Sequence, residues 1–271
     1  MGNRIYSSTK EMSKIIIKNA EQIEGIRKSS QLAGNTLKFI SEHVKEGVNT
    51  LHLDKLVDEY IRDHGAIPAP LNYYGFPNSC CISLNNVICH GIPSEKTILK
   101  EGDILNIDVT TILDGYYGDT STMFTIGDIS KEAAKLVEDT EHALYLGIDQ
   151  VRPDNYFGNI GFSIGRFAKS NKYSVVYDFC GHGVGLDFHE EPQVDHIISK
   201  RNLGEKMRPG MIFTIEPMIN LGKARAVVDK KDGWTARTAD SKLSAQFEHT
   251  ILVTKEGYDI LSDVGEYDIF K

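Results

Sequence analysis

The sequence predicts an α/β (α+β) fold in which helices flank an antiparallel sheet and two related halves face each other. Three observations predict it: an internal repeat, helix-like segments before each copy, and hairpin signals within and after each copy. The segment 99–108 matches 207–216 position for position at an offset of 108 residues. Both copies end on an acid, so we expect a pseudo-twofold axis that brings Asp108 and Glu216 together at the centre.

Helical spacing precedes each copy of the repeat. In the first half, apolar residues follow one helical stripe over 19–44 and another over 53–61, separated by a turn at 47–49. The second half keeps this spacing over 151–167, at an offset of 107 residues. Each half is therefore expected to hold a pair of helices followed by a long antiparallel hairpin.

A short hairpin is expected before the first long one. Residues 80–92 have an extended pattern with a tight turn at Asn85-Asn86. This hairpin carries Cys81 and His90, and we expect His90 to face the site as a hydrogen-bonding group.

Two acids share one face of the first long hairpin, whose turn is predicted at Asp114-Gly115. A two-residue loop there pairs Thr110 with Asp119 and makes Asp108 a diagonal neighbour, whereas a four-residue loop pairs the two acids directly. Only a three-residue loop would separate them. Ionised carboxylates that lie so close together repel each other, and a shared proton or a bound metal resolves the repulsion. The alternative is a pair of acids on a solvated face.

The second half supplies two more acids. Glu216 and Glu248 lie inside strand-like apolar runs, where an unpaired charge is costly. The turn signal Asp232-Gly233 lies midway between them, so paired strands would bring the two acids level. Something must neutralise their charge.

Two histidines lie seven residues apart in a glycine-rich region. His182 lies within Gly181–Gly185, but no Gly-Lys-Ser/Thr and no helical segment follows, which argues against a phosphate loop. The string after His189 lacks the second histidine of a zinc-protease helix. Each histidine taken alone is typical of a buried structural residue. Four acids with imidazole suit two divalent ions such as Mn²⁺, Fe²⁺ or Co²⁺ better than a structural zinc.

Composition argues against several other classes. The 271 residues carry 30 Lys plus Arg against 38 Asp plus Glu, a net charge of −8, which opposes nucleic-acid binding as the main activity. No apolar stretch approaches the roughly 18 residues of a membrane helix, and the four cysteines suit no disulfide framework. We expect a cytoplasmic chain with reduced thiols, a flexible arm over 1–14 and a single domain over 15–271, with halves of about 15–127 and 128–271.

Together these motifs resemble the short bacterial type I methionine aminopeptidases, members of the pita-bread metallopeptidase family. The resemblance extends over about 15–262. It is densest at 82–93, 102–121, 181–193, 213–218, 232–235 and 244–250. The chain departs from the family pattern where Pro70 stands at the pocket rim and where the Pro-Gly turn of each half keeps only Gly47 or Pro153.

The resemblance implies a dinuclear site in which Asp119 and Glu248 bridge two divalent ions and His182 binds one of them. The implied ligands are Asp108, Asp119, His182, Glu216 and Glu248. The implied catalytic residues are His90, His189 and Glu216, with both histidines touching the substrate. The residues implied to surround the methionine side chain are Tyr73, Phe76, Cys81, Phe188 and Trp234.

The implied reaction removes N-terminal methionine from nascent proteins whose second residue is small. The expected partners are nascent polypeptide N-termini, which a monomeric chain would also meet at the ribosome, without nucleic-acid or membrane contacts. Two alternatives share the fold: a proline-specific aminopeptidase or prolidase, and a non-catalytic pita-bread binding protein. Enzymes of the first kind usually carry an extra N-terminal domain, and proteins of the second kind have lost metal ligands.

Overall fold

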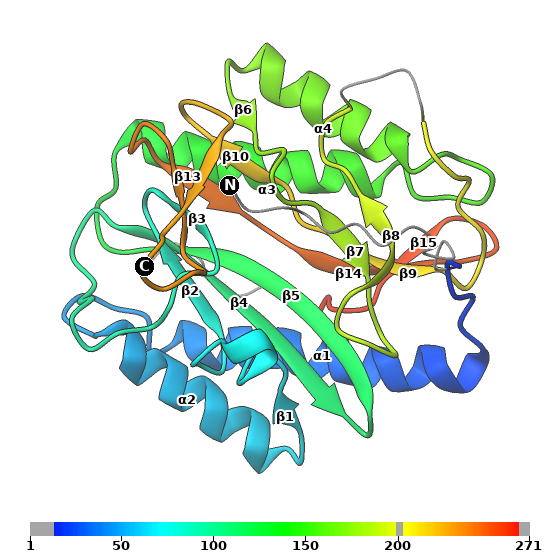
Figure 1. Cartoon of the computed structure of the whole chain (residues 1–271), viewed down its shortest axis with the longest axis horizontal. Helices are drawn as coiled ribbons and strands as arrows, with labels where there is room; N and C mark the ends of the chain where they lie inside the picture. The colour runs from blue at the N-terminus through cyan, green and yellow to red at the C-terminus, as the bar shows by residue number, and fades with distance from the viewer. Residues whose placement is uncertain (1–13, 199–202, 266–271) are drawn as a thin grey trace, which may run out of the picture.

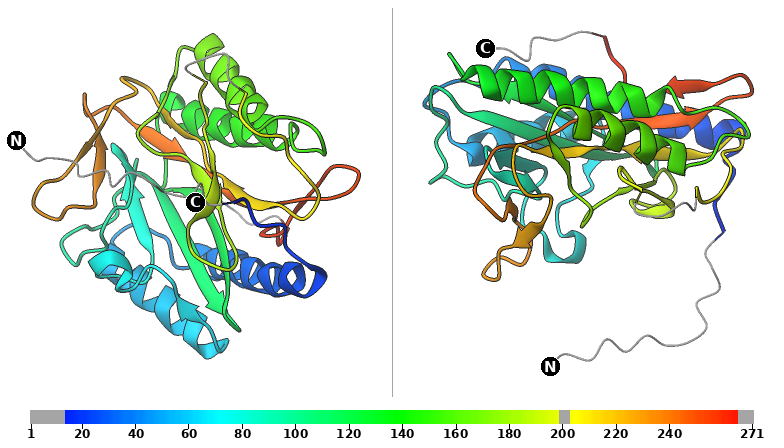
Figure 2. Two further views of the ribbon diagram at one scale, coloured as in Figure 1. Left: turned by 45° about the vertical axis from the view of Figure 1, so that its right-hand side comes forward. Right: turned by 90° about the horizontal axis from the view of Figure 1, so that it is seen from above.

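The computed structural model describes residues 14–198 and 203–265, and in it the strands run between two pairs of helices (Figure 1). The first pair is α1 (Ala20–Ser41) and α2 (Thr50–Asp63), and the second is α3 (Lys131–Ile148) and α4 (Gly158–Ser170). Seen from above, α1 and α3 lie along the same side of the strands (Figure 2). No helix in the described parts of the chain is long and apolar enough to cross a membrane.

Side-chain caps fix where the helices begin. Asn19 accepts the Gln22 N–H at 2.9 Å while the Gln22 side chain accepts the Asn19 N–H at 2.9 Å, a capping box that starts α1. Asn49 caps α2 through the His52 N–H, and Ser130 caps α3. The predicted pairs of helices are thus confirmed, although α1 ends three residues before the predicted end of its stripe.

The strands of the first half are centred on one long hairpin. They are β1 (Ile67–Pro68), β2 (Cys81–Leu84), β3 (Val87–Cys89), β4 (Ile104–Leu113) and β5 (Tyr116–Thr125), with a 3₁₀ turn at Tyr73–Gly75. In the β4–β5 ladder Thr110 lies opposite Asp119, which selects the two-residue loop and excludes the four-residue one. Asp114 and Gly115 have φ of 52° and 84°, the left-handed pair that a type I′ turn requires.

The short hairpin of residues 80–92 differs from the prediction. The turn is present, but β2 pairs with β4 whereas β3 pairs with β12 (Ala236–Thr238). The two strands separate because each adds to a different sheet, and the Ile82 N–H still donates to the Gly91 carbonyl at 2.9 Å.

The second half has shorter strands. They are β6 (Ser174–Val175), β7 (Gly181–Gly183), β8 (Glu190–Val194), β9 (Ile212–Ile215), β10 (Met218–Asn220), β11 (Ala226–Val228), β12, β13 (Ser244–Gln246), β14 (His249–Val253) and β15 (Tyr258–Ile260). The repeat is visible in the backbone, since β4 and β9 begin at matched isoleucines. Gly102 and Gly210, two residues earlier, have φ of 89° and 90°.

The prediction of one long hairpin in the second half is wrong. It is divided between two sheets, with β9 pairing with β14 in one and β10 with β13 in the other. The register is nevertheless continuous across the division, because Ile215 faces His249 and Met218 faces Gln246. The same register places Glu216 level with Glu248 at the point where the sheets part.

The two halves join along β5 and the segment before β14. The Glu248 N–H donates to the Ser121 carbonyl at 3.0 Å, and the Ser121 N–H donates back to the Glu248 carbonyl at 3.3 Å. Separate hydrophobic clusters support the halves, one under α1 and α2 and the other under α3 and α4. The four acids therefore lie at a seam between two packed cores.

The predicted arm over 1–14 falls, apart from Lys14, outside the described residues.

Candidate metal centre and active site

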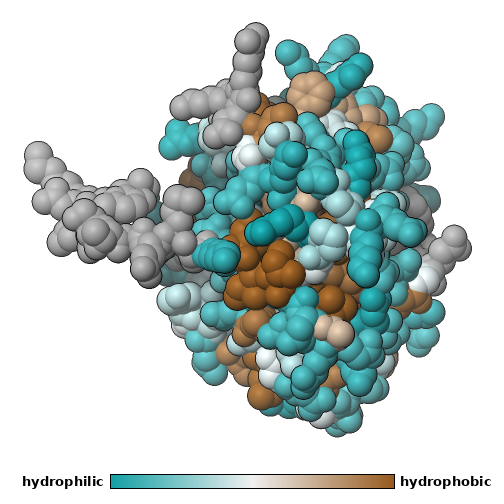
Figure 3. Space-filling model, turned by 90° about the vertical axis from the view of Figure 1, so that its right-hand side faces the viewer, coloured by the Kyte–Doolittle hydropathy of each residue, from teal (hydrophilic) through white to brown (hydrophobic). Residues whose placement is uncertain are grey.

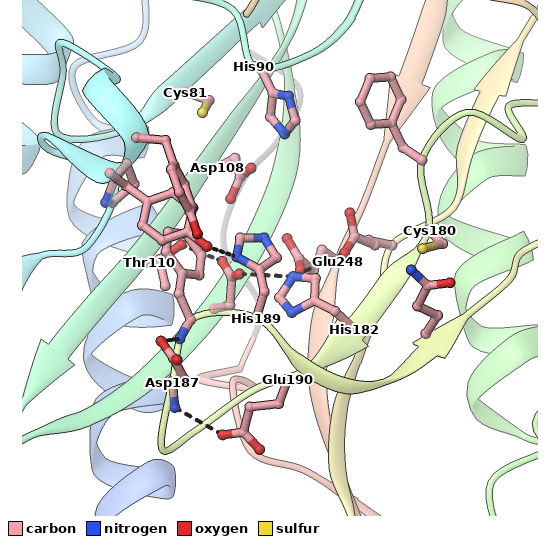
Figure 4. Close-up of a pocket in the computed structure, with 18 of the residues that line it drawn as sticks. Cys81, His90, Asp108, Thr110, Cys180, His182, Asp187, His189, Glu190 and Glu248 are labelled. Carbon is pink, nitrogen blue, oxygen red and sulfur yellow. Dashed lines mark hydrogen bonds and ion pairs between the residues drawn. The ribbon is translucent and has the colours of Figure 1, made fainter. Parts of the chain in front are cut away.

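A cavity of about 830 Å³ opens at the seam between the halves (Figure 4). The structure brings to this cavity every residue that the sequence analysis placed in the site. These are Tyr73, Phe76, Cys81, His90, Asp108, Asp119, His182, Phe188, His189, Glu216, Trp234 and Glu248.

The first half contributes its two acids from the β4–β5 hairpin. Asp108 and Asp119 are diagonal neighbours on one face, as the two-residue loop requires. The Thr110 hydroxyl donates to Asp119 Oδ1 at 2.8 Å, so this carboxylate is fixed by its cross-strand partner. Cys81 lies opposite Asp108 in the β2–β4 ladder, which places a thiol next to the acids.

Glu216 is held by three neighbours at the division of the second hairpin. Its Oε1 accepts the Thr214 hydroxyl at 2.8 Å, and its Oε2 accepts the Gln246 amide at 3.3 Å. Its backbone N–H donates to His196 Nε2 at 3.0 Å. The backbone of Glu248 is fixed as well, because Thr120 donates to its carbonyl at 2.7 Å in addition to the bridge with Ser121.

His182 presents one ring nitrogen to the acids. Its Nδ1 lies 3.0 Å from the Gly183 carbonyl, so Nδ1–H donates there and Nε2 keeps its lone pair. Nε2 lies 3.7 Å from Asp119 Oδ2 and 3.5 Å from Glu216 Oε1, too far for good hydrogen bonds. One ligand atom from each of Asp119, His182 and Glu248 lies within 4.8 Å of the others. Carboxylate oxygens with one imidazole are donors that suit a hard or borderline divalent ion.

The electrostatics also favour a cation. Burial raises the pKa of Asp119 to about 7, and burial together with the neighbouring acids raises the pKa values of Asp108, Glu216 and Glu248 well above their usual range. Burial lowers the pKa of His182 to about 3, so this ring is neutral. Of the described residues that line the cavity, Lys14 alone has a Lys or Arg side chain. The acids therefore need either protons or bound metal ions.

Aromatic side chains form the wall beside the acids. Phe76 packs edge-on against Trp234 with ring centroids 5.3 Å apart, and Tyr73 packs against Phe188 at 4.7 Å. His90 has a left-handed φ of 55° and lies edge-on to Trp234. Such a backbone conformation is strained for a residue other than glycine and is common at functional sites.

His189 is oriented by an aromatic neighbour. Its Nδ1 lies 2.8 Å from the Tyr73 hydroxyl, and Figure 4 shows this contact at the centre of the cavity. Burial lowers the pKa of His189, so its ring is neutral near pH 7. The contact occupies Nδ1 and leaves Nε2 for another partner.

Several neighbours of the site were not assigned from sequence. Thr110 was placed opposite Asp119 by one loop register, but nothing marked its hydroxyl as a donor. His196 and Gln246 carry no local signal, because they reach Glu216 only after distant strands pair. Lys14 was assigned to the arm, yet it lines the cavity.

Comparison with known proteins identifies the family. Residues 24–255 match the model of metallopeptidase family M24. The chain belongs to this family. It is 50% identical to methionine aminopeptidase A of Synechocystis over 93% of this chain and 98% of that protein.

Solved structures agree with this assignment and with the predicted pita-bread fold. The crystal structure of methionine aminopeptidase from Rickettsia prowazekii matches with a TM-score of 0.90 and 48% identity, covering 92% of this chain and all of that one. An Xaa-Pro dipeptidase from Bacillus anthracis matches with a TM-score of 0.75 at 18% identity, covering 95% of this M24 chain and 64% of that one. This second likeness shows the shared fold alone.

We predict that Asp119 makes a contribution to the stability of the metal-free protein that is lost as the pH rises from 6.5 to 8. The folded pKa of Asp119, about 7, lies above its unfolded value of about 4, so the folded state holds a proton that the unfolded state has released. The buried histidines act in the opposite direction near pH 6.5, because burial lowers their folded pKa values while the unfolded state still holds about half a proton on each. The Asp119 contribution is therefore measured as the difference in unfolding free energy from Asp119→Asn, by thermal or urea unfolding, and we expect that difference to change by about 1 kcal/mol over this range.

The comparison variant is Asp119→Asn, which lacks this titration and keeps every histidine. Saturating Mn²⁺ should remove the pH-dependent loss of the Asp119 contribution from the unsubstituted protein, since bound cations replace the protons. A difference between the two proteins that does not change from pH 6.5 to 8, or that changes with the opposite sign, would contradict the electrostatic account.

Proposed function

We propose that this M24 chain is a metal-dependent methionine aminopeptidase, which hydrolyses the bond after an N-terminal methionine when the second residue is small. The observation that carries the proposal is the meeting of four buried acids and one histidine beside an aromatic wall. Identities near 50% to methionine aminopeptidases over nearly the whole chain support the same activity.

The proposed metal ligands are those of the sequence analysis. Asp108, Asp119, His182, Glu216 and Glu248 would hold two divalent ions, such as Mn²⁺, Fe²⁺ or Co²⁺, with Asp119 and Glu248 as the bridging carboxylates. When bound, two such ions supply Lewis acidity and make water nucleophilic near neutral pH. The donor types fit these ions, and the raised pKa values of the acids support the proposal, because buried carboxylates that are crowded together favour bound cations.

The chain's own groups would move the protons and orient the peptide. Glu216 would take the proton of the attacking water on a carboxylate oxygen and pass it to the leaving amine. His189 would donate from Nε2 to the peptide while Tyr73 occupies Nδ1. His90 would donate to the developing oxyanion from the opposite wall.

The side chain of methionine would lie against the aromatic wall. Phe76, Trp234 and Phe188 offer ring faces and edges, and Cys81 adds a polarizable thiol. Sulfur–ring contacts add to the burial of a thioether, so this composition favours methionine over residues with charged side chains. The proposed partners are nascent polypeptide N-termini in the cytoplasm, met by a monomeric chain, with the ribosome as one place of encounter.

The substrate assay separates the proposal from its alternatives. The purified protein with added Mn²⁺ or Co²⁺ should release methionine from Met-Ala-Ser and leave Ala-Pro peptides intact. A chelator should abolish the activity. Faster cleavage of Ala-Pro peptides would favour a prolidase, and no cleavage of either peptide would favour a binding protein.

Substitution of a bridging acid should remove metal as well as activity. Asp119→Ala or Glu248→Ala should lower the metal content from about two ions to one or none and abolish turnover, because each acid is proposed to contact both ions. Metal content is measured by elemental analysis after dialysis. The matched control is Glu191→Gln, an exposed acid at the cavity rim, which should keep its metal. Full activity in either bridging variant would overturn the dinuclear site.

The histidines should divide into two classes. His90→Ala should lower kcat by about 100-fold or more with metal content unchanged, as expected for loss of a hydrogen bond made in the transition state. His182→Ala should instead lose metal. Elemental analysis that gives the reverse pattern would show that the two roles are wrongly assigned.

A further inference from the structure

A buried ion pair outside the proposed catalytic groups joins the start of the described chain to the wall of the cavity. Lys18 Nζ contacts Glu190 Oε2, and the two side chains are 1% and 7% exposed. Lys18 lies just before α1, whereas Glu190 begins β8, so the pair connects segments 172 residues apart. Buried charges of this kind are costly unless both are present and further hydrogen bonds satisfy them.

The other carboxylate oxygen of Glu190 binds the loop that enters the site. Its Oε1 accepts the Leu186 N–H at 2.6 Å and the Asp187 N–H at 3.0 Å, and Figure 4 shows Glu190 beside Asp187. The next two residues of this loop are Phe188 and His189, which form the aromatic wall and the proposed peptide contact. One carboxylate thus holds the backbone that presents both side chains.

Lys18 is held by its backbone as well as by its ammonium group. Its backbone N–H donates to the Gly210 carbonyl at 2.8 Å, just before β9, so the lysine cannot follow the loop if the loop moves. The neighbouring residues are less buried: Ile16 and Ile17 are 40% and 44% exposed. Figure 3 looks at the side of the molecule where α1 begins and shows a hydrophobic patch there among mainly hydrophilic side chains. Lys18 therefore ties this segment into the interior together with Ile15, which is 8% exposed and belongs to the core under α3 and α4.

We infer that Lys18 is a positioning residue for the aminopeptidase reaction, acting through Glu190 on the loop 185–189. The inference rests on the proposed function, because the loop matters for turnover only if His189 and Phe188 contact the substrate. Without the ammonium group, the carboxylate of Glu190 is left as an unpaired buried charge. It then turns toward water and releases the two loop N–H groups.

The test uses the full chain loaded with Mn²⁺ and three variants. Lys18→Met keeps the aliphatic stem and removes the charge, and it should lower kcat/KM for Met-Ala-Ser at least 10-fold with metal content unchanged. Lys18→Met/Glu190→Gln also removes the orphaned charge, while the Gln oxygen still accepts both N–H groups. The kcat/KM of this double variant should recover to within about 3-fold of that of the unsubstituted protein. Lys28→Met, an exposed lysine on α1, is the matched control and should be unchanged.

A second measurement does not depend on activity. Amide hydrogen exchange of a peptide that spans the loop should be at least 10-fold faster in Lys18→Met than in the Lys28→Met control, and it should slow again in the double variant. If Lys18→Met fails to fold, recovery of fold and activity by the double variant supports the inference. A double variant as impaired as the single one shows that Lys18 acts only by packing, and overturns it.

The same experiment separates the two proposals. If the unsubstituted protein cleaves Met-Ala-Ser and Lys18→Met is as active as the control, the positioning role is wrong and the proposed function stands. If the unsubstituted protein does not cleave the peptide, the proposed function fails, and the inference that rests on it fails with it. Hydrogen exchange then reports only whether the ion pair orders the loop.

Discussion

Mutual repulsion among four buried carboxyl groups is the constraint on which the rest of the structure depends. Burial raises the pKa values of Asp108, Asp119, Glu216 and Glu248, and neighbouring carboxylates raise those of Asp108, Glu216 and Glu248 further. A flexible backbone would relax by moving these groups apart into water. The acids stay together because backbone or side-chain hydrogen bonds hold each one on a strand or directly beside one, and each half is supported by its own hydrophobic core. The cost of that arrangement is offset when cations bind.

The division of the second hairpin positions two of these acids. Where β9 gives way to β10, and β13 to β14, the two acids leave the regular ladder, and their N–H groups need other partners. His196 accepts one, and Ser121 of the opposite half accepts the other. The break in the sheet therefore becomes the place where the halves are joined, and the same bonds that satisfy the backbone aim the carboxylates into the cavity.

The sequence was sufficient for the fold class, the pairs of helices and the gathering of the acids, because each rests on a local or repeated pattern. The two-residue turn at Asp114-Gly115 has its own sequence signature and fixes the register of the first hairpin. The division of the second hairpin could not be predicted, since it depends on how two sheets diverge. The contacts of His196, Gln246 and Lys18 could not be predicted either, because they join residues 20 to 172 positions apart without any periodic signal.

The order of the acids along the chain has a consequence for biosynthesis. Asp108 and Asp119 are translated early, but Glu248 and the strand β14 that follows it come more than 120 residues later. When only the first half of the chain has emerged from the ribosome, two of the four acids are present, but the second half that completes the seam is not. Pairing over such long sequence separations is slow, because much loop-closure entropy is lost before the contacts form. Newly made molecules are thus expected to gain affinity for metal in one late step rather than gradually.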